Sequence, residues 1–457
     1  MKTRYSLVVV FVVAGMLLAA CGGAATPPPT QAPAAAQPTT APAAAQPTTA
    51  PAAQPTEAPA AQPTTAPAAA AVKLTMWTKE GGNQLDLVKS VVADCAKADG
   101  SYTVDIVNYD VEKLRGNFQT SALAGTGPDL LWTVNDHAGP FTTADLIDPV
   151  DNLGIDLKQF VPGALEPVAL NGQHWGIPLS YGNNLMLLYN KKLVDHAPAD
   201  TAELVKMAKD FQAKNPGSVG FAWNLEEPFW LVPWLGGFGG KVFADDGKTP
   251  TLNTPEMVKA LALMSEFKNT DQITPKACDY ACADSLIKDG KAAMIINGDW
   301  SLGDYTGSTA NVTATKNIDL GTAPFPKITG ADAPKPYTAG VYLMFPKGQA
   351  DDKRAAALKL TQCLISDPVQ LRWLKEQKRL PSVQKLFDDP SVKSDPILSG
   401  SAADLLNGTG MPAATEMRCN WDAMKPQLQD VMAGKTTPED AAKAMQTAAE
   451  KCVAELK

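Results

Sequence analysis

Short apolar runs alternate with longer helix-like patterns from about residue 72 to the end of the chain. The short runs have the length and bounding residues that are typical of strands. We predict strands at 73–77, 103–107, 128–132, 185–189, 292–296 and 340–345. Because helices are expected between these strands, the pattern predicts an α/β fold in which helices cover the faces of the sheets.

Two of the expected helices carry clear start signals. Thr254-Pro255 and Thr437-Pro438 each place a threonine before a proline, and each pair is followed by an acidic residue. A threonine side chain accepts a hydrogen bond from the first free N–H groups of a helix, and proline is well tolerated at the first helical position. We therefore predict helices that begin at Pro255 and Pro438.

The first 20 residues are typical of a leader peptide. Lys2 and Arg4 precede an apolar run at 5–20, which is shorter than the roughly 20 residues of a membrane-spanning helix. The sequence Leu-Ala-Ala-Cys that ends at Cys21 resembles the lipobox of bacterial lipoproteins. This resemblance implies a lipid on Cys21 and an extracytoplasmic protein anchored to the cell membrane. An ordinary signal peptide with a chance cysteine is the alternative.

A tether is expected to follow at 21–71. Residues 22–71 consist mainly of Pro, Ala, Thr and Gln, contain Glu57 as their one charge, and lack Leu, Ile, Val, Phe, Met and aromatic residues. Such a segment has nothing with which to form a core, and its prolines favour an extended, disordered chain. The tether either holds the domain clear of the envelope or is a spacer of no required length.

Charge and cysteine content narrow the class of protein. Lys plus Arg number 40 against 48 Asp plus Glu, a net charge of −8, which leaves no basic face for a nucleic acid. Of the 7 cysteines, those other than Cys21 are even in number and suit disulfides in an oxidising compartment. They are Cys95, Cys278, Cys282, Cys363, Cys419 and Cys452. Their pairing stays open, although Cys278 and Cys282 are close enough for a local bridge. A metal site is not expected, because there is neither a Cys-x-x-Cys pair nor a nearby histidine.

The sequence gives little support for an enzyme. It contains no Gly-x-Ser-x-Gly, Walker or Gly-x-Gly-x-x-Gly motif, so nucleophilic hydrolases and the common nucleotide-binding enzymes lose support, and no cofactor is expected. A glycoside hydrolase needs two carboxylates about 5 to 9 Å apart. Asp136, Glu226, Glu227 and Asp299 could supply them, but so could any polar ligand site.

The aromatic residues point to a carbohydrate. The chain has 9 Trp, and Trp223, Phe229, Trp230 and Trp234 lie in one short stretch that also contains Glu227. The apolar face of a sugar stacks on an aromatic ring, while its hydroxyl groups need polar partners. A role in the core is the alternative, and it is stronger for Trp223 and Trp234 than for the residues next to Glu227.

A series of motifs spans residues 72–457 in order. They are Lys73-Leu74-Thr75-Met76-Trp77, Gly127-Pro128-Asp129-Leu130-Leu131-Trp132, Asn171-Gly172-Gln173, Leu188-Tyr189-Asn190-Lys191, Asn224-Leu225-Glu226-Glu227-Pro228-Phe229, Asn297-Gly298-Asp299-Trp300 and Gly434-Lys435-Thr436-Thr437-Pro438-Glu439. Each motif is weak alone. Together, their order and spacing resemble the extracellular solute-binding proteins of bacterial ABC importers, in the maltose/maltodextrin-binding branch.

This resemblance implies a periplasmic-binding-protein-like fold of two α/β lobes with the ligand in the cleft at the hinge. The expected boundaries are 72–182 plus 342–388 for the N-terminal lobe and 183–341 plus 389–457 for the C-terminal lobe. The implied function is capture of a malto-oligosaccharide by lobe closure, without catalysis, and delivery to the transmembrane subunits of a permease. The protein is expected to be a monomer.

The resemblance also implies the site residues. Asp136 and Glu227 match positions that bond sugar hydroxyls, and the aromatic matches are Phe229, Trp230, Tyr280, Trp300 and Trp421. Lys79 and Glu80 stand where the best-known maltose binders have an Asp-Lys pair, or are plain surface charges. Asn183 replaces a common Glu, and His137 replaces a usual Arg by a weaker cation.

Because of these departures, the sequence does not identify which sugar is bound. The alternatives are a binding protein for a different sugar or small solute, a surface glycoside hydrolase and an adhesion lipoprotein for a polymeric glucan.

Overall fold

The computed structural model describes residues 70–308 and 318–456. The leader peptide, Cys21 and nearly all of the expected tether at 21–71 therefore lie outside the described residues. The chain divides into two units, of which the second, 67–457, contains all the described residues and is considered by itself.

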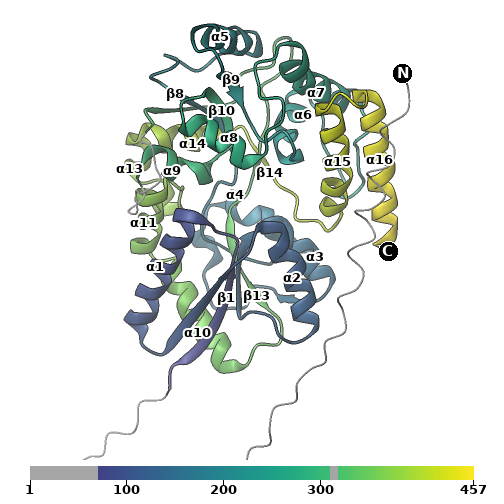
Figure 1. Cartoon of the computed structure of the whole chain (residues 1–457). Coiled ribbons are helices and arrows are strands. Elements are labelled where there is room, and N and C mark those ends of the chain that lie inside the picture. The colour runs from purple at the N-terminus through teal and green to yellow at the C-terminus, as the bar shows by residue number, and fades with distance from the viewer. Residues whose placement is uncertain (1–69, 309–317, 457) are drawn as a thin grey trace, which may run out of the picture. The chain divides into compact units, whose positions relative to one another are not determined.

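The first sheet has six strands in the order β2-β1-β3-β13-β4, with β7 also paired to β13. Their bounds are Tyr102–Asn108, Val72–Thr78, Leu130–Val134, Val341–Pro346, Ile147–Asp148 and Ile177–Pro178. β1 runs parallel to β2 and β3, whereas β13 is antiparallel to β3. Helices α1 (Gly82–Asp99), α10 (Asp351–Leu364) and α11 (Asp367–Gln377) supply apolar side chains to the core of this sheet, and Figure 1 shows α1 and α10 beside β1.

The second sheet has four strands in the order β11-β8-β10-β9. Their bounds are Leu320–Ala323, Leu185–Asn190, Ala292–Gly298 and Val219–Ala222. β8 is antiparallel to both of its neighbours, and β9 is parallel to β10. Helices α5 (Thr201–Lys214), α8 (Tyr280–Lys288) and α14 (Pro396–Leu405) pack against β9, β10 and β11 respectively.

The chain passes between the two sheets more than once. It leaves the first sheet after β7, enters the second at β8, and returns from β11 to β13. Gly182 and Ala339, which lie on these two connections, form an isolated β-bridge. A short parallel pair of β12 (Tyr337–Thr338) and β14 (Thr409–Gly410) ties in the later part of the chain. The expected lobe boundaries agree with this path but stay a prediction.

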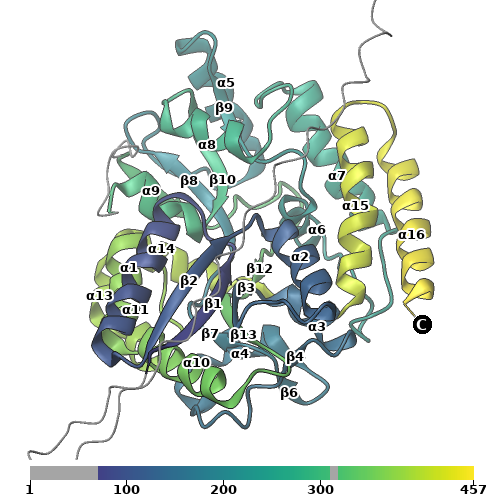
Figure 2. The same ribbon diagram turned by 60° about the horizontal axis from the view of Figure 1, so that its bottom comes forward.

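Two long C-terminal helices pack together on α7 (Pro255–Ser265). They are α15 (Glu416–Met432) and α16 (Pro438–Glu455), which Figure 2 shows side by side.

The remaining helices and strands are α2 (Val111–Leu123), α3 (Ala138–Thr143), α4 (Pro162–Leu165), α6 (Val232–Gly237), α9 (Leu302–Thr306), α12 (Gln384–Phe387), α13 (Pro390–Ser394), β5 (Ala169–Leu170) and β6 (Gln173–His174). Short helical turns that carry polar or aromatic side chains are η1 (Asn135–His137), η4 (Pro228–Trp230) and η6 (Asp299–Ser301), with η2 (Leu157–Gln159), η3 (Glu166–Val168) and η5 (Glu266–Thr270) elsewhere.

The structure decides the disulfide pairing that the sequence left open. Cys95–Cys363 joins α1 to α10, Cys278–Cys282 lies at the start of α8, and Cys419–Cys452 joins α15 to α16. The first and third bridges close loops of 268 and 33 residues. A bridge that closes a longer loop restricts the unfolded chain more and therefore stabilises the fold more.

The predicted fold class and elements are confirmed. All of the predicted strands are present as β1, β2, β3, β8, β10 and β13. The largest shift is in β3, which begins at Leu130 and not at Pro128, because proline lacks the N–H group that a central strand needs. The helices at Pro255 and Pro438 begin as predicted, with Thr254 and Thr437 accepting backbone N–H groups. Within the described ranges, no helix is long and apolar enough to cross a membrane.

Candidate functional site

One face of α15 reaches three carboxylates on other segments of the chain. Trp421 Nε1 donates to Asp136 Oδ2 at 3.1 Å, and Lys425 Nζ forms an ion pair with Glu227. Arg418, one turn before Trp421, lies on the same face and pairs with the third carboxylate, that of Glu112. Residues three and four apart share one side of a helix, which is why these side chains point in a common direction. Asp136 lies in η1, at the end of β3 in the first sheet, so α15 connects distant parts of the sequence.

Arg418 makes the third contact of this face. Its NH1 atom lies 2.8 Å from Oε2 of Glu112 on α2, and the same oxygen is 2.9 Å from NH2 of Arg115. Asp422 also pairs with Arg418. These side chains are partly exposed, so each pair contributes only about 0–1 kcal/mol. Their importance is geometric, because they join α2 to α15 beside Asp136.

The five predicted aromatic residues form one cluster. The ring of Phe229 lies 5.9 Å from Trp230, 6.2 Å from Trp300 and 6.3 Å from Trp421, between ring centroids. Tyr280 lies 6.3 Å from Trp230, and its hydroxyl accepts a hydrogen bond from Trp300 Nε1 at 3.1 Å. The rings meet at tilted and edge-to-face angles, so their faces are not stacked on one another. Phe229, Trp300 and Trp421 are only partly buried, so part of their ring surface is open to an apolar ligand surface.

The members of this aromatic cluster differ in exposure. Trp230 is 7% exposed, and its Nε1 donates to the backbone oxygen of Ile296 at 2.9 Å, so it is a buried member of the cluster that is held by β10. Tyr280 is 37% exposed and reaches solvent. Trp223 and Trp234, the other two tryptophans of the same sequence stretch, are each 1% exposed and belong to the core. The core interpretation was therefore correct for these two.

Asp136 has a free oxygen at the edge of the aromatic cluster. While Oδ2 accepts from Trp421, Oδ1 is buried and has no hydrogen-bond partner among the described residues. Burial, helped by the nearby carboxylate of Glu112 and opposed by the Trp421 hydrogen bond and Arg115, raises the pKa of Asp136 to about 6. A buried acceptor without a partner costs roughly 1–3 kcal/mol, which a ligand hydroxyl would recover.

His137 does not supply the weak cation that was expected from the sequence. The residue is 1% exposed, and its Nδ1 lies 2.7 Å from the hydroxyl of Thr133. Burial, together with the positive charges of Arg115 and Arg418, lowers the pKa of His137 to about 3. The expectation of a cation here is wrong, because a charged imidazole would lose its hydration without gaining an acid partner.

Glu80 lies in a buried ion-pair network. Arg379 donates to both of its oxygens, at 2.8 and 3.1 Å, and Lys79 Nζ approaches at 3.1 Å. Trp132 Nε1 lies 3.3 Å from the same carboxylate. Although burial alone would raise the pKa of Glu80, the charges of Arg379 and Lys79 lower it to about 2. The surface-charge alternative is wrong for Glu80, because the side chain is 1% exposed, whereas a ligand contact at Glu80 stays a prediction.

The backbone explains the asparagine at position 183. Asn183 has a φ of 50°, in the left-handed region that asparagine adopts more readily than glutamate. It follows Gly182 of the β-bridge, and its backbone N–H bonds the carboxylate of Asp299. Burial raises the pKa of Asp299, and Arg379 and Lys79 lower it in opposition. Asn183 therefore lies beside the Lys79–Glu80–Arg379 network, on the connection between the sheets.

Sequence reasoning missed three basic residues of this region, which are Arg379, Arg418 and Lys425. The spacing of Arg418 and Lys425 around Trp421 was a usable signal, since all three share a helix face. Arg379 carries no sequence signal, because its partner Glu80 is far away in the chain. Within the described residues, no group of His, Cys, Asp and Glu side chains is arranged to hold a metal ion.

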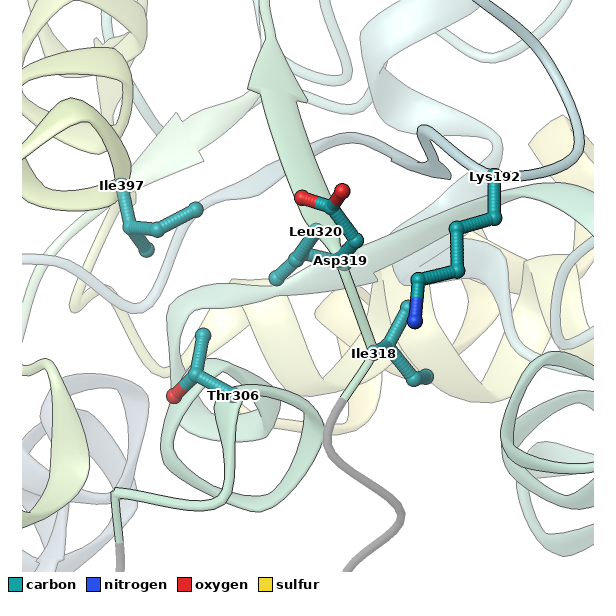
Figure 3. A pocket seen from close by; sticks show the side chains of 6 residues that line it. All are labelled: Lys192, Thr306, Ile318, Asp319, Leu320 and Ile397. Atoms are coloured by element: carbon teal, nitrogen blue, oxygen red, sulfur yellow. The ribbon is translucent and has the colours of Figure 1, made fainter.

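A separate cavity of about 410 Å³ lies away from these residues. Figure 3 shows the side chains that line it, which are Lys192, Thr306, Ile318, Asp319, Leu320 and Ile397. None of the predicted site residues is among them. The aromatic cluster, Asp136 and the face of α15 are therefore the candidate site.

Comparison with known proteins places this geometry in a family. Residues 90–400 match the model of the bacterial extracellular solute-binding proteins. The maltotriose-binding protein of Pyrococcus abyssi is 26% identical over 366 residues, which are 79% of this chain and 77% of that protein. The galactooligosaccharide-binding protein of Bacillus subtilis is 23% identical over 382 residues, 81% of this chain and 86% of the other.

A solved structure agrees with these relatives. The maltose/maltodextrin-binding domain MalE of Bdellovibrio bacteriovorus, bound to maltotriose, is 33% identical with a TM-score of 0.78, and the match covers 84% of this chain and all of that one. The two α/β lobes, the aromatic cluster and the family match lead to one conclusion. The chain belongs to the bacterial extracellular solute-binding proteins and is a binding protein, not an enzyme.

Proposed function

We propose that this protein is the lipid-anchored binding component of an ABC importer, that it captures a malto-oligosaccharide by lobe closure, and that it delivers the sugar to the transmembrane subunits of a permease. The observation that carries this proposal is the aromatic cluster beside the unpartnered Oδ1 of Asp136. The cluster offers apolar ring faces, and Asp136 offers an acceptor for a hydroxyl group. A glucose unit has both kinds of surface.

The contacts around Trp421 support capture by closure. Trp421 belongs to the expected C-terminal lobe, and Asp136 belongs to the expected N-terminal lobe, yet they share a hydrogen bond. Arg418 and Glu112 repeat this connection. A ligand favours a closed state only through interactions that are better there than in an open state. A sugar between the aromatic cluster and Asp136 would gain contacts from both sides at once.

The choice of a malto-oligosaccharide rests on the relatives. The P. abyssi protein is named for maltotriose, and the B. bacteriovorus domain holds that sugar. The B. subtilis relative, named for galactooligosaccharides, makes another oligosaccharide the second candidate. Both sugar classes present the same mixture of apolar faces and hydroxyl groups, so the site chemistry alone supports either.

Calorimetric titration of the purified protein tests this proposal. The ligands are maltose, maltotriose, a longer maltodextrin, a galactooligosaccharide and xylobiose, and every mixture is checked afterwards for hydrolysis. We expect one-to-one binding of a malto-oligosaccharide, with a Kd on the order of micromolar or tighter, and no products. A heat of binding with the galactooligosaccharide alone would mean that this sugar, and not a malto-oligosaccharide, is the ligand. Hydrolysis products would mean that the protein is a glycoside hydrolase and not an importer component.

The anchor is tested separately. Cys21 is the proposed lipidation site, and the pattern Leu-Ala-Ala-Cys supports it. Cells that express the full chain should incorporate labelled fatty acid into the protein, and Cys21→Ser should abolish both the label and membrane retention. Equal labelling of Cys21→Ser would contradict the anchor. Stable attachment needs two or more acyl chains, so loss of the cysteine should release the protein completely.

A further inference from the structure

Asn184 and Asp404 form a buried polar pair where the chain enters the second sheet. Asn184 immediately precedes β8, and Asp404 lies near the end of α14. Asn184 Nδ2 donates to Asp404 Oδ2 at 2.7 Å, and the two residues are 0% and 1% exposed. This bond attaches α14 to the connection between the sheets.

The second oxygen of each side chain has no partner. Both Asn184 Oδ1 and Asp404 Oδ1 are buried, and neither has a hydrogen-bond partner among the described residues. Two oxygens cannot bond each other unless one carries a proton, and each buried oxygen without a partner costs free energy. A carboxylic acid and an amide complement each other fully, because the acid O–H can donate to the amide oxygen while the amide N–H donates to the acid. The soft terminal torsions of Asn and Asp allow this coplanar arrangement.

We propose that Asp404 is a neutral carboxylic acid whose proton completes a two-bond pair with Asn184, and that this pair positions the adjacent Asn183, a ligand residue predicted from the sequence. Asn184 also accepts the backbone N–H of Asp299 at 3.2 Å. Asn183 in turn donates its backbone N–H to the Asp299 carboxylate. A displaced Asn184 would therefore move two residues beside the Lys79–Glu80–Arg379 network.

The surroundings of Asp404 favour its neutral form. Burial raises the pKa of Asp404 to about 7, and the Asn184 hydrogen bond lowers it in opposition. The charged groups on the neighbouring elements are Asp395 with Lys378 at the start of α14, Lys393 on α13, Asp319 with Lys191 beside β11, and Asp299 near Arg379 and Lys79. None of them is among the causes that set the pKa of Asp404. Among the residues that the structure describes, no cation therefore stabilises the ionised carboxylate.

Ionisation should consequently weaken the pair. A carboxylate at position 404 has no proton to donate to Asn184, so the pair would keep only one of its two bonds and both buried oxygens would stay without a partner. The protonation of Asp404 rests on the described contacts alone, whereas its effect on ligand affinity rests also on the proposed function. The experiment therefore has one part that needs no ligand.

Infrared spectroscopy of the full protein detects the proton directly. At pH 6 we expect the carbonyl band of a neutral carboxyl group that disappears as the pH rises through about 7 and that is absent from Asp404→Asn. The control Asp395→Asn, at the other end of α14, should keep the band. Asp136→Asn is measured alongside, because Asp136 contributes its own titration near pH 6. If no band is lost in Asp404→Asn, Asp404 is ionised and the proposal is wrong.

Thermal unfolding gives a second readout with a defined sign. The ordinary pKa of an aspartate is about 3.9, and that of folded Asp404 is about 7, so folding of the wild type takes up a proton between these values. Its stability should fall, relative to Asp404→Asn, as the pH rises from about 4 to about 7, and the difference should then stay constant. Asp395 has a lowered pKa, so its charged form stabilises the fold at neutral pH. Asp395→Asn should therefore be less stable than the wild type at neutral pH, and this difference should vanish on acidification.

Ligand titration completes the test. Between pH 6.5 and about 8.5 the wild type should lose several-fold affinity for maltotriose, and Asp404→Asn, whose amide can make both bonds at any pH, should not. Parallel profiles for the two proteins would overturn the positioning role. If no sugar binds at any pH, the proposed function is wrong, but the infrared and unfolding results still decide whether Asp404 carries a proton. If Asp404→Asn does not fold, the infrared titration of Asp136→Asn decides it, because the Asp136 band is absent there and a band lost near pH 7 would report the Asp404 proton.

Discussion

At the scale of single residues, two of the predicted acids differ in whether their oxygens already have partners. Asp136 keeps a buried oxygen without a partner, whereas Glu80 is held by Arg379 and Lys79. Both acids were predicted as ligand contacts from sequence position. Their different surroundings, and not their chemical type, leave an acceptor without a partner on Asp136 and none on Glu80.

Removing the acceptor at Asp136 should weaken sugar binding. Asp136→Asn keeps the shape of the side chain but replaces a charged acceptor, and hydrogen bonds to charged groups contribute about 1.5–3 kcal/mol. We expect the affinity for the best sugar to fall by roughly 10-fold to 100-fold in calorimetry. Asp430→Asn, a change at a partly exposed position on the same helix as Trp421, serves as control. Unchanged affinity in Asp136→Asn would remove this residue from the site.

Breaking the Glu80 network should destabilise the fold. Glu80→Gln leaves Arg379 buried without its partner, and losing one member of a buried pair costs about 3–5 kcal/mol. Because the pKa of Glu80 is lowered to about 2, the stabilisation is present above the ordinary pKa and is lost as the pH falls from about 4.5 to about 2. Denaturant unfolding at pH 7 and pH 3 checks this, with the exposed Glu226→Gln as control. Equal losses for the two variants would contradict the network.

At the scale of elements, α15 is the part on which the candidate site depends most. Its face supplies Arg418, Trp421 and Lys425, and its inner side is joined to α16 by Cys419–Cys452. The disulfide and the three residues of this face are on one helix, so the bridge restrains the position of the face. The sequence predicted the start of α16 through Thr437 but not the partner of Cys419.

Removing this disulfide should cost more than removing the local one. Loop closure predicts a loss of about 4 kcal/mol for the bridge that spans 33 residues, and about 2 kcal/mol for Cys278–Cys282, which spans 4. The two double serine variants are compared by denaturant unfolding. A larger loss for Cys278→Ser with Cys282→Ser would show that contacts around the bridges outweigh the constraint on the unfolded chain.

At the scale of the whole molecule, the proposed closure involves contacts between segments that belong to different expected lobes. Arg418 and Glu112 form one such contact near Asp136. An ion pair that forms only on closure adds to the apparent affinity of a ligand, even of a neutral sugar, since the ligand draws on every contact of the closed state.

Arg418→Gln should therefore weaken sugar affinity in a salt-dependent way. The pair is partly exposed, so we expect a loss of at most about five-fold, which shrinks as salt screens the wild-type pair. Arg372→Gln, whose partners Asp94 and Glu376 lie in the sequence of one expected lobe, is the control and should leave affinity unchanged. Calorimetry at low and high salt checks both variants. A loss in Arg418→Gln that salt does not reduce would mean a direct ligand contact.

The sequence by itself determined the α/β fold, the strands, the helix starts at Pro255 and Pro438, and the set of aromatic residues. These follow from local periodicity, from capping chemistry and from motifs that are contiguous in the chain. Tertiary structure alone decided the disulfide pairs, the burial of His137 and Trp230, the engagement of Glu80 by Arg379, and the free oxygen of Asp136. The reason is physical, because charge state and availability depend on neighbours brought from distant parts of the chain, and local sequence does not encode burial or the identity of those neighbours.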